Sequence, residues 1–370
     1  MSSKKALVLV LAIVMCLSLC LTACGGSSST GTTTTATAQT SSGDSSGTAA
    51  AAPDKVYNWK FQSTENDTIA MYRERDEICQ KIAEETNGGL IITQYSGGAI
   101  ISDMNIPDAV MTGTIEMGNV YLNPLYASVP TSNMVGITPG FLFDVGDCML
   151  YLLGYGALDV FKTECEETLN CYCYPELTGR VLYCTNKEVH EAEDFKGLQI
   201  KSYGPLGNIY TKLGASVVTL SGSEIYTALQ TNLIDAANWG AYEGAVGASL
   251  QEVTKYFIEP CMGIGVGTVD LINKDAYDAL PADYQAIVDK YFSTRIYDSV
   301  LATDTGEYNA RQTMLDAGMQ PSELSEDCKA TIREMALTEI ETLSKANDAC
   351  AEIYDDLMLF LEYQDTLQWN

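Results

Sequence analysis

A few cationic, amide and aromatic side chains follow predicted strands in a chain that is otherwise acidic, with a formal net charge of −28. Lys201 follows the segment GLQI, and Asn238 and Trp239 follow LIDAA. Ligands of open α/β sheets bind beyond the carboxyl ends of strands, so these side chains are expected on one rim. One or two basic groups held in a cleft attract an anion even when the whole protein is acidic. The spacing therefore predicts an anion-binding pocket.

Each of these side chains also has an explanation without a ligand. Lys201 would then be an ordinary solvated lysine, and Trp239 would be core packing, as most aromatic residues are. Their positions beyond strands favour the pocket for both. Tyr121 is the last residue of the segment EMGNVY and one of 22 tyrosines. The sequence therefore favours neither a role in the pocket wall nor ordinary packing for this residue.

The sequence offers little for catalysis. An enzyme needs a nucleophile, a general base or a metal. From residue 55 onward the chain has no G-x-S-x-G and no H-E-x-x-H, and its single histidine has no evident partner. A binding protein without an organic cofactor is therefore expected, and an exported enzyme is the less favoured alternative.

The elements that must position these residues alternate between strand and helix. Apolar periodicity predicts strands at 56–62, 90–95 and 116–121 and helices at 69–85 and 106–113. This order predicts parallel strand pairing in an α/β lobe.

A second α/β set follows the first. Its predicted strands are residues 179–186, a segment ending near Ser202, Val217 with Val218, and 234–236. Helices are expected between these strands. The tail from residue 281 onward has helical periodicity, with Leu280-Pro281 opening a long helix through YQAIVDKYF.

The N-terminus has the pattern of an export signal. Two lysines precede an apolar stretch, and LTAC at residues 21–24 looks like a lipobox, in which Cys24 takes a lipid. A short membrane helix is the alternative. We expect a signal at 1–23 and a lipidated, flexible Gly/Ser/Thr-rich tether at 24–54, which would hold the body at the extracytoplasmic face of the cell membrane.

Charge and cysteines narrow the function further. The negative charge makes nucleic acid and anionic lipid poor partners. Nine cysteines lie beyond the signal without any Cys-x-x-Cys, so no metal site has a recognisable spacing. They are interpreted as small buried hydrophobes with at most one or two disulfides.

The segment DFKGLQIKSYGPLGNIYTKLGASVVTLSGSEIYTALQTNLIDAANW, residues 194–239, resembles the solute receptors of tripartite ATP-independent periplasmic (TRAP) transporters. The segments IDAANW and YGPLGN are most similar to those of the receptors in this family that bind α-keto and related acids. The resemblance implies two α/β lobes with a long connecting helix, a periplasmic-binding-protein-like fold that closes on a small carboxylate. It also implies delivery of this ligand to the small and large membrane subunits of the transporter.

The resemblance also assigns roles to single residues. Lys201 stands where the family uses an arginine to bind the substrate carboxylate, and Arg180 matches a second contact. Asn238 and Trp239 match a carboxylate and a tryptophan that border a bridging cation, and Tyr121 matches a pocket aromatic. A lysine orients a carboxylate less strictly than an arginine does. A neutral Asn238 weakens any cation site, so a bridging cation is allowed but not required.

These observations together predict the organisation of the chain. One lobe would comprise 55–178 and 262–300, and the other would comprise 179–261 and 301–370 with the C-terminal helices. A tethered co-receptor that presents its ligand to a membrane sensor would need the same pocket, so this alternative to a transport receptor stays open.

Overall fold

The computed structural model describes residues 53, 55–67, 69–136, 145–178, 181–220, 222–261 and 263–367. The predicted signal, Cys24 and the tether up to residue 52 lie outside these residues, and so does Arg180. Among the described helices, none combines the length and the apolar character that a membrane crossing needs.

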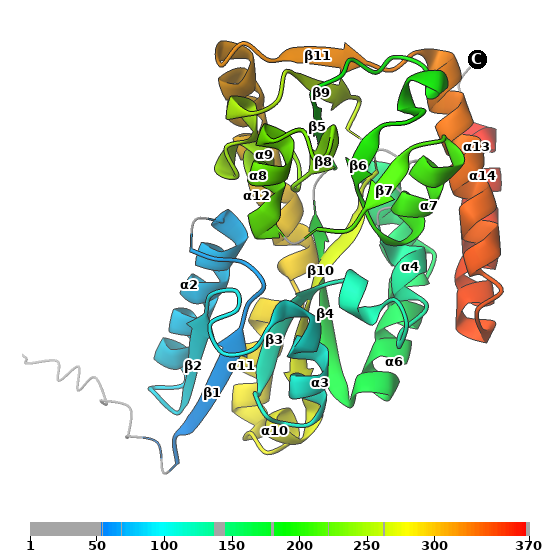
Figure 1. Ribbon diagram of the computed structural model, residues 1–370. Helices are drawn as coiled ribbons and strands as arrows, with labels where there is room; N and C mark the ends of the chain where they lie inside the picture. Colours follow the sequence, from blue (N-terminus) through cyan, green and yellow to red (C-terminus); the bar gives the residue numbers. More distant parts are fainter. Residues whose placement is uncertain are drawn as a thin grey trace, which may run out of the picture. The chain divides into compact units, whose positions relative to one another are not determined.

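The first lobe is built on a five-stranded sheet with the strand order β2-β1-β3-β10-β4 (Figure 1). β1 is parallel to both β2 and β3, as the strand–helix alternation predicts. β10 runs antiparallel to both of its neighbours, β3 and β4, and neither β10 nor β4 was predicted. The bounds of the strands are β1 Tyr57–Gln62, β2 Leu90–Tyr95, β3 Met117–Tyr121, β4 Cys171–Thr178 and β10 Gly265–Asn273.

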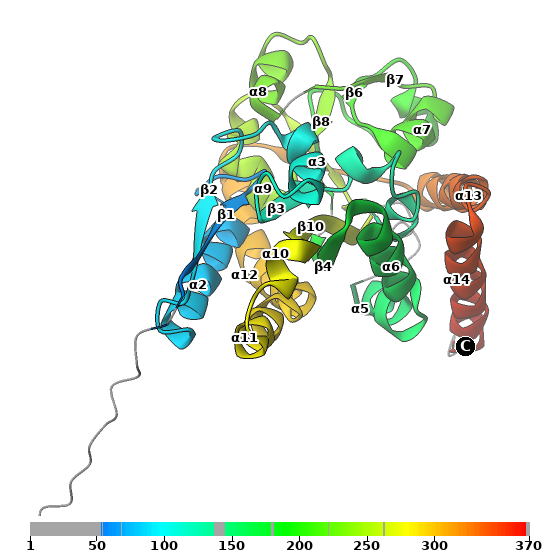
Figure 2. The same cartoon turned by 90° about the horizontal axis from the view of Figure 1, so that it is seen from below.

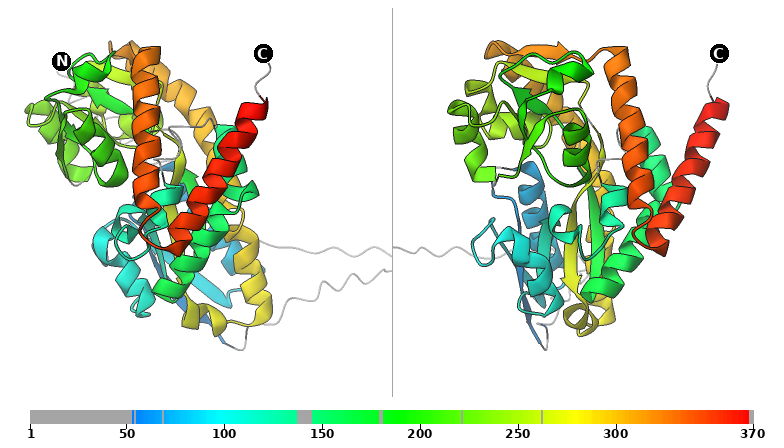
Figure 3. Two further views of the ribbon diagram at one scale, coloured as in Figure 1. Left: turned by 90° about the vertical axis from the view of Figure 1, so that its right-hand side faces the viewer. Right: turned by 45° about the vertical axis from the view of Figure 1, so that its right-hand side comes forward.

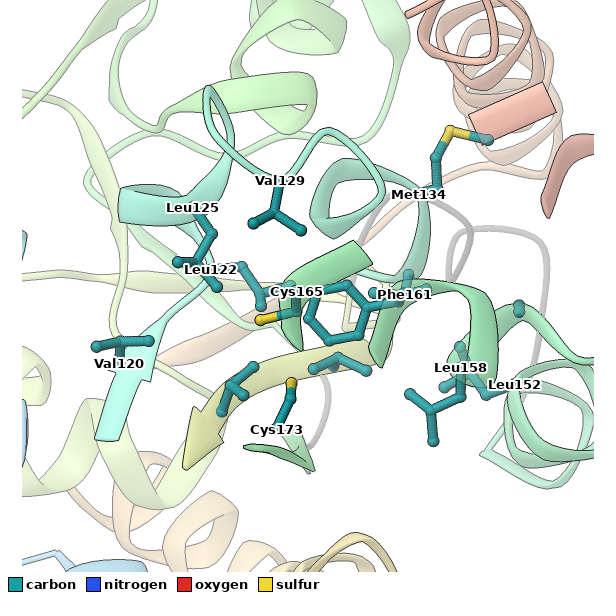
Figure 4. Packing of buried hydrophobic residues seen from close by; sticks show 14 of the residues in the cluster. Val120, Leu122, Leu125, Val129, Met134, Leu152, Leu158, Phe161, Cys165 and Cys173 are labelled. Atoms are coloured by element: carbon teal, nitrogen blue, oxygen red, sulfur yellow. The ribbon is translucent and has the colours of Figure 1, made fainter. Parts of the chain in front are cut away.

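Helices pack on this sheet through apolar residues at helical spacing. α2 buries Ile78 and Ile82 and ends where Asn87 and Gly88 take positive φ angles, which is the predicted helix stop. In Figure 4, Phe161 and Cys165 of α6 lie close to Cys173 of β4. The helices of this lobe are α2 Ala70–Glu85, α3 Ile106–Met111, α4 Ser132–Val135, α5 Val145–Met149, a π-helical turn Leu150–Gly154, α6 Ala157–Leu169, α10 Lys274–Asp278 and α11 Ala282–Phe292.

The second lobe contains a six-stranded mixed sheet with the order β11-β9-β5-β8-β6-β7. β6 is parallel to β7 and β8, whereas β5 is antiparallel to β8 and β9. Its strands are β5 Tyr183–Thr185, β6 Gln199–Lys201, β7 Ser216–Val218, β8 Ala236–Asn238, β9 Tyr256–Glu259 and β11 Gln320–Glu323. Its helices include α7 Gly204–Lys212, α8 Gly222–Gln230, α9 Tyr242–Gly247 and α13 Glu326–Leu343.

The prediction for strand 234–236 was two residues too early. The backbone N–H groups of Leu233 and Ile234 both donate to the carbonyl oxygen of Ala228, at 2.9 and 3.3 Å, and so belong to the turn that ends α8. The strand begins only at Ala236, and Asn238 is its last residue. Asn238 therefore ends the strand instead of following it.

The long connecting helix implied by the resemblance is α12, Arg295–Asp316. It contacts β4 in the first lobe and α9 in the second. The helix predicted to open at Leu280-Pro281 and to run through YQAIVDKYF is a separate element, α11, which spans Ala282–Phe292 with Pro281 as its N-cap. The Glu307 carboxylate accepts a hydrogen bond of 2.6 Å from the backbone N–H of Tyr242 and so fixes α12 to the second lobe.

The first-lobe end of α12 is held by a buried charge network. Glu176 of β4 accepts from Arg295 at 2.6 Å, from Arg75 of α2 at 2.8 Å and from the Thr268 hydroxyl at 2.7 Å. Arg75 also pairs with Glu65. Burial raises the pKa of Glu176, but the charges of Arg75 and Arg295 outweigh it and hold the pKa at about 2. The connecting helix is thus anchored by an ionised carboxylate with almost no exposure.

The C-terminal helices together contact both lobes. α13 packs on α7 of the second lobe and also contacts α4 of the first, and α14, Asp348–Leu367, packs on α6 of the first lobe (Figure 2). Figure 3 shows the two as consecutive helices in orange and red. The predicted lobe boundaries stay a prediction, but α14 contacts the first lobe although 301–370 was assigned to the second.

None of the nine described cysteines, from Cys79 to Cys350, forms a disulfide. All are buried except Cys261, which is half-buried. Cys165 and Cys173, for example, belong to the apolar core around Phe161. This arrangement agrees with their interpretation as small hydrophobic core residues.

Candidate functional site

A pocket lies between the two lobes at the end of β6. The empty space between its walls, including the part open to solvent, is about 350 Å³. The lining residues are Tyr126, Asn133 and Gly136 from the first lobe and Ser202, Tyr203, Leu206 and Asn238 from the second.

Strand register explains why the second-lobe residues meet. β6 and β8 are parallel, and Lys201 is paired with Ala237, the residue before Asn238. Both strands therefore end at the same edge of the sheet, as the sequence predicts for residues 201 and 238. The chain leaves β6 through Ser202 and Tyr203 and enters α7 at once. The strand end and the helix start thus form one wall.

Lys201 is a buried cation, with only 4 % of its surface exposed. Its ammonium nitrogen lies 3.3 Å from Oδ1 and 3.4 Å from the backbone oxygen of Asn238. The nitrogen is also 4.9 Å from the ring centroid of Tyr203 and 5.9 Å from that of Trp239, within cation–π range. The alternative of a solvated lysine is therefore wrong.

The contacts of Lys201 are all with neutral groups. No carboxylate of the described residues forms an ion pair with it, although the chain is rich in acids. Burial alone lowers the pKa of Lys201 to about 8, with no neighbouring charge contributing. At neutral pH the side chain is mostly protonated. Lys201 does not itself line the pocket, but its charge lies next to the lining residues Asn238 and Tyr203.

The start of α7 adds to this positive field. Tyr203 is the N-cap residue of the helix, and its side chain makes no capping hydrogen bond. The first N–H groups of a helix carry a partial positive charge and attract anions. Gly204 has φ +56°, and an added Cβ would lie 2.4 Å from Cε2 of Tyr126. Glycine therefore permits the close contact between the first lobe and the start of α7.

Trp239 has features of both interpretations given for it, core packing and a position in the pocket wall. Its ring is half-buried against Gly222 of α8, where an added Cβ would lie 2.2 Å from the ring. It packs on the apolar cluster of the second lobe that includes Phe257. It is not among the lining residues, but it approaches the Lys201 ammonium group. Trp239 thus supports Lys201 from the core side.

Tyr121 lies at the end of β3 and is half-buried. Its pKa is raised by burial and by the nearby Glu65 and Tyr203. The phenol is therefore close to the second lobe, although it does not line the pocket described above. The predicted role of Arg180 cannot be placed on this geometry, since that residue lies outside the described part of the chain.

Several pocket residues were missed in the sequence. Ser202 and Tyr203 directly follow a predicted strand, so the rule that selects Lys201 also selects them. Tyr126 and Asn133 lie in the segment after the predicted strand 116–121, which is again a carboxyl end. Leu206 and Gly136 do not follow a predicted strand in this way, so the sequence did not indicate them.

Two α/β lobes, a long connecting helix and a pocket at strand ends define a two-lobed solute-binding protein. Residues 61–345 match the family model of bacterial extracellular solute-binding protein, family 7. The chain belongs to this family. The recognition of a TRAP-type receptor is confirmed, and so is the periplasmic-binding-protein-like α/β fold.

Relatives of the chain agree with this assignment. A monocarboxylate 2-oxoacid-binding periplasmic protein of Nostoc is 24 % identical over 321 residues, covering 84 % of this chain and 85 % of the relative. A TRAP solute-binding protein of Colwellia psychrerythraea with bound calcium and pyruvate superposes with a TM-score of 0.77 at 21 % identity, covering 84 % and 96 %. One from Pseudoalteromonas atlantica with bound sodium and pyruvate gives 0.76 at 21 %, covering 84 % and 96 %.

The family settles the broad functional class. Its members are solute receptors and not enzymes, which agrees with the lack of catalytic motifs. The protein is therefore an extracytoplasmic solute receptor. The two solved structures named above contain a metal ion together with pyruvate.

Proposed function

We propose that this receptor binds a small monocarboxylate against Lys201 and delivers it to the membrane subunits of a TRAP transporter. The observation that carries the proposal is a buried ammonium group that pairs with no described carboxylate and lies next to Asn238 and Tyr203, two lining residues of the interlobe pocket. The uncapped start of α7 would supply N–H groups to the same anion. The 2-oxoacid-binding Nostoc relative and the pyruvate-bound structures support this ligand class.

The pocket walls favour a ligand with a small, partly apolar body. Tyr126 and Tyr203 approach the pocket from opposite lobes, and Leu206 adds an aliphatic surface. Among the described residues of the second lobe, Lys201 is the one buried cation next to lining residues, which matches a ligand with a single carboxylate. Asn238, Trp239, Tyr121 and Arg180 are proposed as further binding or supporting residues, with Arg180 as a second contact to the carboxylate.

The purified body, residues 54–370, is expected to gain thermal stability from pyruvate or lactate and less from succinate. A ligand that binds only the folded state stabilises it by about 2.7 kcal/mol at a concentration 100 times Kd. Such a gain corresponds to a shift of a few degrees in Tm. Differential scanning fluorimetry measures it, with glucose as the neutral control. A shift with glucose and none with any acid would contradict the carboxylate proposal.

We further propose that Cys24 anchors the receptor to the membrane by a lipid. The full-length chain expressed in a bacterium is expected to begin at Cys24 after processing and to incorporate labelled palmitate. Cys24→Ser should keep its signal and take up no label, whereas Cys20→Ser should be labelled like the unchanged chain. Mass spectrometry of the N-terminus and the label count test this. Label in Cys24→Ser, or cleavage at another residue, would refute the lipid anchor.

A further inference from the structure

We propose that this receptor holds its anionic ligand without a bridging metal ion, because the Lys201 ammonium group takes the place beside Asn238 that a cation would need. This inference rests on the proposed carboxylate function. Structures of similar fold contain sodium or calcium together with pyruvate. The question is therefore whether the residues of this chain fit such an ion.

The donor set beside the pocket is unsuited to a metal ion. Calcium takes six to eight oxygen ligands, commonly including carboxylates. Asn238 offers only neutral oxygens, and both of them, Oδ1 and the backbone oxygen, contact the Lys201 nitrogen at 3.3 and 3.4 Å. The Trp239 carbonyl oxygen is packed against Gly244 of α9, where an added Cβ would lie 2.3 Å away. Within the described ranges no group of three His, Cys, Asp or Glu residues could hold a metal.

The charge at this position also opposes a second cation. Lys201 is 4 % exposed, so water screens its charge only weakly. An ion coordinated by Asn238 would lie next to the ammonium group, and no nearby described carboxylate would neutralise the pair. The faces of Tyr203 and Trp239 stabilise one cation there, and that cation is Lys201. The ammonium group thus supplies the positive charge that an ion supplies elsewhere.

The direct test compares ligand affinity with and without metal ions. Pyruvate, lactate and succinate, neutralised with choline hydroxide, are titrated into the EDTA-dialysed protein by calorimetry. The buffers contain choline chloride, sodium chloride, or choline chloride with calcium chloride, all at one ionic strength. We expect the Kd of the best acid to differ less than about two-fold among the buffers, because about 1.4 kcal/mol of metal coordination would already change it ten-fold.

The outcomes separate the two proposals. Binding that appears only with sodium or calcium, or that strengthens ten-fold or more, overturns the metal-free inference and leaves the carboxylate receptor standing. Equal binding in all three buffers supports both. No binding of any acid in any buffer overturns the proposed function, and the inference falls with it.

A variant at Asn238 sharpens the result. Asn238→Asp places a carboxylate next to Lys201, where the new ion pair should compete with the ligand and weaken pyruvate binding at least ten-fold in every buffer. Asn309→Asp adds the same charge on an exposed face of α12 and should change Kd less than two-fold. If calcium instead raised the affinity of Asn238→Asp above that of the unchanged protein, the ammonium group would not exclude a cation, and the inference would be wrong.

Discussion

Replacing Glu176 with glutamine is expected to lower the free energy of unfolding by about 3–5 kcal/mol, the usual cost of breaking a buried ion pair. The Glu176 carboxylate accepts from Arg75, Arg295 and Thr268, and neither arginine has more than 1 % exposure. A neutral amide would leave two buried guanidinium groups facing each other. Equilibrium unfolding in urea, followed by circular dichroism, measures the loss.

Glu74→Gln is the matched control for this substitution. Glu74 also contacts Arg295, at 3.3 Å, but its side chain is 33 % exposed, so we expect a loss below about 1 kcal/mol. The pH dependence adds a second check. The pKa of Glu176, about 2, lies below its ordinary 4.5, so its contribution is present above pH 4.5 and is lost as the pH falls through 2. Equal losses in the two variants would show that the network does not anchor α12.

A buried carboxyl close to this network, that of Asp270, has the opposite behaviour. Asp270 of β10 accepts from the Asn119 amide at 2.9 Å and is fully buried. Burial and the charge of Glu176 raise its pKa to about 8, so it is a neutral acid at neutral pH. The region around the network therefore contains fewer negative charges than its carboxyl groups suggest. The two arginines depend all the more on Glu176.

The sequence predicts those parts of the fold in which local pattern and tertiary packing agree. The strands 56–62, 90–95 and 116–121 have clear boundaries, and their alternation with helices is sufficient to predict parallel pairing. β4 and β10 were missed because both are nearly buried throughout and lack the alternation of a half-exposed strand. Their antiparallel pairing depends on residues about 90 positions apart, which no local window contains.

The sequence predicts those residues of the candidate site that lie at the carboxyl ends of strands. Lys201 and Asn238 meet because two parallel strands end at one edge, a relation that needs only the order of the elements. Tyr126 reaches the same pocket from the other lobe, and its contact with Gly204 depends on how the lobes are joined. The network around Arg75 could not be predicted, because MYRERDEICQ looks like an ordinary charged helix until its partners on β4 and α12 are known.

Replacing Lys201 with methionine is expected to weaken binding of the best monocarboxylate at least about 30-fold, because an unpaired buried carboxylate costs about 2–5 kcal/mol. Methionine keeps the length of the stem and removes only the charge. Lys81→Met removes the same charge from an exposed position on α2 and should change Kd less than two-fold. Isothermal titration calorimetry at pH 7 compares the three proteins.

Two further measurements separate a ligand contact from a structural role for Lys201. Its pKa of about 8 lies below its ordinary 10.5, so the folded protein holds the charge at a cost. Lys201→Met should therefore unfold at a higher midpoint than the unchanged protein in the absence of ligand. A lysine that served only packing would give a lower midpoint.

The second measurement is the pH profile of binding. The ligand carboxylate stays ionised above pH 6, and burial raises the pKa values of Tyr121 and Tyr203 above their ordinary range. Only Lys201 among these groups titrates between pH 7 and 9. Affinity should be greatest below pH 8 and fall as the pH rises through 8, since binding must then take up a proton. Lys201→Met should show no such fall, and an equal fall in both proteins would assign the titration, and with it the anion contact, to another group.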